Sequence, residues 1–90
     1  MPLFAIICRD KPGHLQTRLD TRDQHLAFLK DATHLRMAGP LIEDGEMRGS
    51  LLIVEANDLI TVKDWADSDP YKAAGLFTSV EVIEWKKVIG

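Results

Sequence analysis

Hydrophobic residues fall into stretches whose spacing predicts alternating strands and helices. The first stretch, Leu3–Cys8, is apolar at every position, which is typical of a strand buried on both faces. A turn-forming cluster at residues 9–13 follows it and ends in Pro-Gly. Apolar side chains then recur every three to four residues, and this spacing predicts a helix that Asp20 or Thr21 caps and that extends to about Leu35.

A β-hairpin is predicted in the middle of the chain. The segments Met37–Ile42 and Gly49–Glu55 have the composition of strands, and they flank the dipeptide Asp44-Gly45. Asp-Gly favours a type I′ turn, which joins two antiparallel strands.

The last third of the chain predicts a helix, a short turn and a strand. Asp58 is placed to cap the helix, which ends at Asp69-Pro70 because the residue before a proline avoids the helical conformation. The short turn covers Tyr71–Ala74. The last strand spans Phe77–Val88, where apolar and polar side chains alternate.

The order of these elements is strand, helix, strand, strand, helix, strand, which is that of the ferredoxin-like α+β fold. We expect a single domain over residues 1–90, with a four-stranded antiparallel sheet and two helices on one face. The first and third strands are the most uniformly apolar, so we expect them at the centre of the sheet. Because the helices cover one face only, we expect the other face to pack against a second copy of the chain in a homodimer.

Composition narrows the functional classes. The 90 residues carry a formal net charge of −3, which argues against an electrostatically driven nucleic-acid binder. The longest apolar run is far shorter than the roughly 20 residues that span a bilayer, and we recognise no signal-peptide pattern. We therefore expect a cytoplasmic protein that binds neither nucleic acid nor membrane.

The sequence also argues against the common cofactors. The single cysteine, Cys8, excludes an internal disulfide and a cysteine-based zinc site. The three histidines have no metal-ligand spacing, and neither a GxGxxG motif nor a P-loop is present. We expect no metal and no nucleotide cofactor.

One histidine interrupts the apolar face of the first predicted helix. On a helical wheel, His25 lies in the middle of the arc formed by Phe28, Leu29, Ala32 and Leu35. Histidine changes charge near neutral pH and serves as a general acid or base. The alternative is a core histidine that a backbone carbonyl or a neighbouring side chain satisfies.

Asp69 is the second candidate for a catalytic role. A carboxylate facing inward after the second helix can orient a histidine and stabilise its charged form. The alternative is an ordinary N-cap for the turn that follows. The two roles are compatible, because one carboxylate oxygen can accept a backbone N–H while the other faces a histidine.

Basic residues gather near the histidine in the predicted fold. Arg18 and Arg22 share its side of the helix, and Arg9 and Lys11 lie in the preceding loop. Such a cluster can bind a carboxylate, a phenolate or an enolate, or the two helix arginines lie at the edge of the core and pair with acidic neighbours. Ser50 can donate a hydrogen bond to a ligand, or it is a plain strand-edge serine.

Five segments carry a resemblance to a known family, and the last of them is the ending from Val80–Val82 to Lys86–Val88. Arg22–Leu29 resembles an RxxHLxxL helix, Ala38–Pro40 an AGP segment and Gly49-Ser50 a GS strand start. The most specific segment is Trp65–Phe77, which closely resembles a WxxxDPYxxAGxF signature. Together these segments are similar to those of the YciI-like family, and they cover nearly the whole chain in order.

The resemblance implies a ferredoxin-like fold in a dimeric α/β barrel, with an active site built on His25 and Asp69. It also implies that Ser50 and the two arginines Arg18 and Arg22 line the same pocket, and it adds Tyr71 of the DPY segment as a substrate-binding candidate. The chemistry it implies is acid–base lyase or dehydrochlorinase work on small ring compounds.

Three functional hypotheses follow. The first is a cofactor-independent enzyme in which His25 abstracts a proton from a small anionic or phenolic substrate, with elimination or isomerisation. The alternative is a non-catalytic dimer module that binds a metabolite or another protein and leaves its ligand unchanged. A third is a cofactor-free monooxygenase, because such enzymes use the same barrel.

Overall fold

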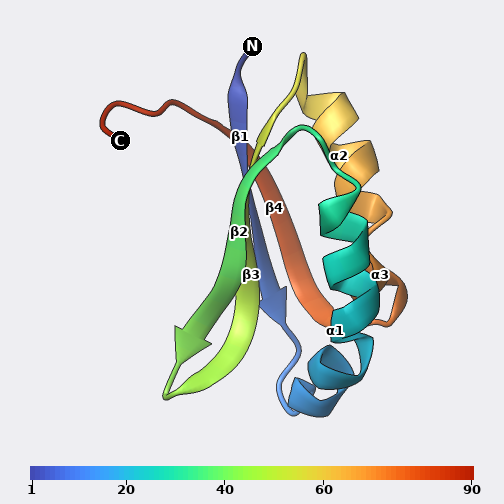
Figure 1. Ribbon diagram of the computed structural model, residues 1–90. Coiled ribbons are helices and arrows are strands. Elements are labelled where there is room, and N and C mark those ends of the chain that lie inside the picture. The colour runs from blue at the N-terminus through green and yellow to red at the C-terminus, as the bar shows by residue number, and fades with distance from the viewer.

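The computed structural model describes residues 1–90 and contains one sheet with helices on one face (Figure 1). The elements in chain order are β1 Leu3–Asp10, α1 Leu15–Lys30, β2 Leu35–Glu43, β3 Glu46–Glu55, α2 Leu59–Asp67, α3 Pro70–Ala73 and β4 Phe77–Trp85. Apart from the short α3, this is the predicted ferredoxin-like order, and the predicted fold class is confirmed. None of the helices has the length and apolarity needed to span a membrane.

The sheet has the strand order β2-β3-β1-β4, and every neighbouring pair is antiparallel. The two most apolar strands, β1 and β3, are central, as predicted from their composition. On the helix side of the sheet they supply most of the core, together with residues of α2. These core residues are Phe4, Ile6, Cys8, Leu52, Val54, Ala56, Val62 and Ala66.

The predicted hairpin between β2 and β3 is present. Asp44 and Gly45 both adopt positive φ, at 52° and 76°, as a type I′ turn requires. The N-cap of α2 is also as predicted, since the Asp58 carboxylate accepts the Thr61 N–H at 2.8 Å.

The first helix differs from the prediction at both ends. It spans Leu15–Lys30, so it begins before Asp20 or Thr21 and ends before Leu35, which lies in β2. Leu35 pairs with Val54 of β3, so the residue that the hydrophobic spacing assigned to the helix belongs to the sheet.

The buried face of α1 explains why its start was missed. The fully buried side chains of this helix are Arg18, Thr21 and His25, all polar, whereas Leu26 and Leu29 are only half-buried. Burial therefore follows a polar stripe in the first half of the helix, and the spacing of hydrophobic residues carries no signal there.

The last strand is shorter than predicted. β4 ends at Trp85, opposite Leu3, the first residue of β1. Its only neighbour in the sheet is β1, so residues 86–90 have no partner strand and extend away from the sheet (Figure 1). The prediction that the strand continues to Val88 is wrong for this reason.

The face of the sheet opposite the helices is uncovered (Figure 1). It carries large apolar side chains from three strands, each at least 38% exposed: Met37, Leu51, Ile83 and Trp85. Apolar side chains in a monomeric protein seldom gather on one open face in this way.

Candidate active site

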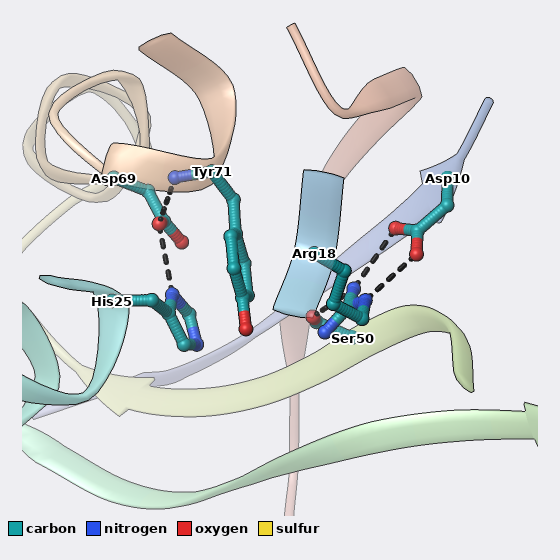
Figure 2. Close-up of polar contacts among 6 residues, drawn as sticks. All are labelled: Asp10, Arg18, His25, Ser50, Asp69 and Tyr71. Carbon is teal, nitrogen blue, oxygen red and sulfur yellow. Dashed lines mark hydrogen bonds and ion pairs between the residues drawn. The ribbon is translucent and has the colours of Figure 1, made fainter. Parts of the chain in front are cut away.

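His25 and Asp69 are in direct contact although 44 residues separate them in the chain. The contact joins His25 Nδ1 to Asp69 Oδ1 at 2.8 Å, and both side chains are buried (Figure 2). His25 is presented by α1, and Asp69 is the N-cap of α3. The extended backbone of Asp69 and the following Pro70 turn the chain at this point and aim the carboxylate at α1.

The two roles considered for Asp69 are both fulfilled, by the same oxygen. Asp69 Oδ1 accepts the backbone N–H of Tyr71 at 2.9 Å as well as the contact from His25 (Figure 2). An ionised carboxylate can only accept, so Nδ1 of His25 is the donor. In the neutral ring this leaves Nε2 as a free acceptor on the side away from Asp69.

The ring of Tyr71 lies between His25 and Arg18 (Figure 2). The His25 and Tyr71 rings stack with centroids 3.9 Å apart and planes 16° apart. The Arg18 guanidinium lies 4.6 Å from the centroid of the same ring. Tyr71 thus fixes the imidazole plane and separates the His25 ring from the Arg18 guanidinium.

Arg18 is held by a buried carboxylate. Its Nε donates to Asp10 Oδ2 at 2.7 Å and its Nη2 donates to Asp10 Oδ1 at 2.9 Å (Figure 2). Nη2 also donates to Ser50 Oγ at 2.9 Å. Because Ser50 accepts from Arg18, its own hydroxyl hydrogen is free to point to a ligand.

These contacts affect the acidity of Arg18 and Tyr71. Burial alone lowers the pKa of Arg18, but the hydrogen bonds and charge of Asp10 outweigh it and raise the pKa. Burial raises the pKa of Tyr71, against the opposing charges of Arg18 and Arg22. The Tyr71 hydroxyl is therefore protonated at neutral pH and can donate a hydrogen bond.

A cavity of about 160 Å³ lies beside the histidine, between α1 and the β2–β3 hairpin. Its polar wall consists of Arg18, Arg22, His25, Ser50 and Tyr71. Its apolar wall consists of Leu26, Leu29, Ala38, Gly39, Pro40, Met47 and Leu52. An engineered protein cavity of roughly 150 Å³ holds benzene, so this volume fits one small ring.

All six candidate residues from the sequence gather at this cavity, five as lining and Asp69 directly behind His25. The wider basic cluster does not. Arg9 points elsewhere and pairs with Glu43 on the surface, and Lys11 is not among the lining residues. Arg18 pairs with Asp10 and not with acidic neighbours on its own helix.

Sequence reasoning missed Asp10. It stands between an apolar strand and a Pro-Gly turn, where an aspartate is ordinarily a turn residue. In β1 it follows Phe4, Ile6 and Cys8 at two-residue spacing, so its side chain points to the same side of the sheet as these core residues.

Neither the single cysteine nor a cluster of metal-binding side chains offers a second reactive site. Burial raises the pKa of the Cys8 thiol to about 12, with a further contribution from the charge of Asp69, so this cysteine is no nucleophile at neutral pH. Three or more His, Cys, Asp or Glu side chains do not come together anywhere as metal ligands would.

Two bacterial proteins align with this chain over nearly their full length. Protein YciI of Escherichia coli O6:H1 is 38% identical over 96 residues, covering 96% of this chain and 98% of that protein. An uncharacterised protein of Haemophilus influenzae is 39% identical over 95 residues, covering 94% and 97%. The family model of the YCII-related domain matches residues 2–86.

A solved structure with a known reaction is also similar. The 5-chloro-2-hydroxyhydroquinone dehydrochlorinase TftG of Burkholderia phenoliruptrix, in complex with 2,5-dihydroxybenzoquinone, superposes with a TM-score of 0.85, at 37% identity and 93% coverage of both chains. SnoaB, a cofactor-independent oxygenase of Streptomyces nogalater, has a TM-score of 0.63 at 11% identity, covering 100% of this chain and 97% of that one. The second likeness concerns the fold alone.

Proposed function

The chain belongs to the YCII-related domain family, and we propose that it is a small-molecule enzyme of the lyase kind, in which His25 and Asp69 act as an acid–base pair. The observation that supports this most strongly is the 2.8 Å contact between the two side chains at the wall of a ring-sized cavity. A core histidine that Asp69 merely satisfied would not need to line a cavity as well.

In the proposed reaction, Nε2 of His25 takes a proton from a hydroxyl or carbon of the substrate. The ring becomes an imidazolium, which Asp69 stabilises through Nδ1. The imidazolium then returns this proton to a ring carbon of the substrate, which isomerises. Where that carbon bears the leaving group, a second hydroxyl loses its proton to solvent through His25, its electron pair forms a C=O bond, and the shifted ring electrons expel the leaving group. No redox step is involved, because protons and electron pairs balance among the substrate, the histidine and solvent.

Other polar residues of the cavity are proposed to bind the substrate. Arg22 has no ion-pair partner and reaches the cavity from the exposed side of α1, so it suits an oxyanion. Ser50 and Tyr71 each offer a hydroxyl hydrogen there, and the apolar wall suits the face of a ring. These features favour a flat, oxygen-bearing and anionic or phenolic substrate.

The similarity to TftG gives the proposal a first substrate to try. We propose a chlorinated hydroxyquinol, 5-chloro-2-hydroxyhydroquinone, as a probe for chloride release. Wild-type protein is expected to release chloride faster than buffer, and His25→Gln is expected to lose about 10²–10⁴-fold in rate, the usual contribution of a general base. The matched control is His14→Gln, because His14 lies outside the cavity.

The outcomes separate the hypotheses. Unchanged chloride release by His25→Gln would remove His25 from the mechanism. Binding of the probe with its full recovery would favour the non-catalytic module. Oxygen consumption with a quinol would favour the monooxygenase hypothesis.

We also propose that the protein is a single-domain, cytoplasmic homodimer joined through the uncovered face of its sheet. Support comes from the apolar side chains on that face. The segment after β4 adds to it, because this segment extends away from the sheet (Figure 1) and its Val88 and Ile89 are at least 84% exposed. In a dimer, apolar area on both surfaces would be removed from contact with water, which is favourable.

Sedimentation velocity tests the dimer. Leu51→Glu places a charge in the proposed interface, and we expect it to convert the dimer to monomer. Ile60→Glu is the control, because Ile60 is exposed on α2 and belongs to the helix side. A wild-type protein that sediments as a monomer at micromolar concentration would refute the dimer.

A further inference from the structure

The two arginines of the cavity differ in their charge balance. Arg18 is bound by Asp10 through two hydrogen bonds of 2.7 and 2.9 Å, and both side chains are at most 4% exposed. No carboxylate pairs with Arg22, which lines the same cavity. Arg18 therefore contributes hydrogen bonds and a flat surface to the cavity, but its charge is cancelled.

The position of Asp10 in β1 brings its carboxylate to Arg18. Asp10 is the last residue of β1 and follows the core residues Phe4, Ile6 and Cys8 at two-residue spacing. Alternate residues of a strand share one face, and the Asp10 carboxylate consequently faces α1 and not the uncovered side of the sheet. A buried carboxylate is costly unless it is paired, and Arg18 is its only ion-pair partner.

The charges around the cavity can then be counted. Arg18 and Asp10 sum to zero, and the negative charge of Asp69 lies behind the His25 ring, which separates it from the cavity. Only Arg22 remains as an unpaired cation at the cavity wall. A ligand with one negative charge finds a partner there, whereas a second negative charge on the same ring would be desolvated without one.

We propose that Asp10 is a specificity-determining residue that restricts the cavity to ligands with a single negative charge, by cancelling the charge of Arg18. This rests on the proposed function in one respect, that the cavity is the ligand site. It does not require turnover. Asp10 acts through Arg18 and has no place among the residues that line the cavity.

The test compares two flat probes that differ by one charge, benzoate and isophthalate, by isothermal titration. Wild-type protein is expected to bind benzoate more tightly than isophthalate. In Asp10→Asn the Arg18 charge is unmasked in a poorly solvated wall, and we expect the affinity for isophthalate relative to benzoate to rise by roughly tenfold or more. Glu43→Gln is the matched control, because it removes one negative charge from the exposed pair with Arg9, and its ratio is expected to stay within about twofold of wild type.

A double variant distinguishes a charge effect of Asp10→Asn from a loss of folding. Asp10→Asn combined with Arg18→Gln removes both charges, so the ratio is expected to return to the wild-type value. The proposal is overturned by equal ratios in Asp10→Asn and Glu43→Gln, by a double variant that keeps a raised ratio, or by absence of binding of either probe to all these proteins. Failure of wild-type turnover would overturn the proposed function alone, since these ratios are measured without a reaction.

Discussion

Replacing Asp69 by asparagine removes one charge from the candidate active site and keeps the size of the side chain. Asp69 Oδ1 accepts both from His25 Nδ1 at 2.8 Å and from the Tyr71 N–H at 2.9 Å. The amide oxygen of Asn can preserve the N-cap, but it has no charge to stabilise an imidazolium. We expect the fold to persist and turnover to fall.

The size of the fall follows from the geometry. Two unit charges about 4 Å apart interact by about 4 kcal/mol at an effective dielectric constant of about 20. An interaction that exists only when His25 carries the proton acts on the transition state, and each 1.4 kcal/mol is about tenfold in rate. Asp69→Asn is therefore expected to lower kcat by about 10³-fold.

The assay is chloride release from the chlorinated hydroxyquinol probe at saturating concentration. The control is Asp67→Asn, because Asp67 is an exposed carboxylate two residues away that pairs with Lys72. Circular dichroism checks that each variant is folded. A fall of less than tenfold in a folded Asp69→Asn protein would refute the electrostatic reasoning.

Three predictions concern stability. Above pH 9 an unfolded Cys8 thiol loses its proton, but the folded thiol, with its pKa raised to about 12, keeps it, so stability falls as pH rises. Urea unfolding measures the free energy of unfolding at pH 7 and at pH 10. Between these two pH values, this free energy is expected to fall by about 1.4 kcal/mol less in Cys8→Ala than in wild type, and identical falls in both proteins would contradict the prediction. Gly49→Ala is expected to prevent stable folding, visible as lost cooperative melting, because an added Cβ would overlap the Cys8 carbonyl oxygen; a normal melt would show that the strands can separate there. The backbone hydrogen bond from Thr61 lowers the pKa of Asp58, so the N-cap stabilises the fold above pH 4 and loses that effect as pH falls; Asp58→Ala should melt lower at pH 7 and converge with wild type in acid.

Local signals in the sequence were enough for most of the fold. The Asp44-Gly45 turn, the Asp58 cap and the apolar character of β1 and β3 each act over a few residues, so they can be recognised without the structure. The start of α1 has no such signal, because it buries Arg18 and Thr21 where a hydrophobic pattern is sought.

The candidate site was accessible to sequence reasoning only in part. His25 stands out on an apolar arc and Asp69 precedes a proline, but neither feature predicts the 2.8 Å contact between the two side chains. The partner of Arg18 was missed, since the two-residue spacing that places Asp10 on the core side of β1 does not say which side chain of α1 it meets. Such long-range geometry is set by packing and not by local composition.

Chemical rescue tests the central claim most directly. His25→Ala leaves a gap beside the Tyr71 ring and Asp69, the two groups that hold the imidazole in place. We predict that this variant releases chloride from the hydroxyquinol probe about 10²–10⁴-fold more slowly than wild type, and that added imidazole restores part of the rate in a saturable manner. A His25→Ala protein that turns over at the wild-type rate without imidazole would contradict the account.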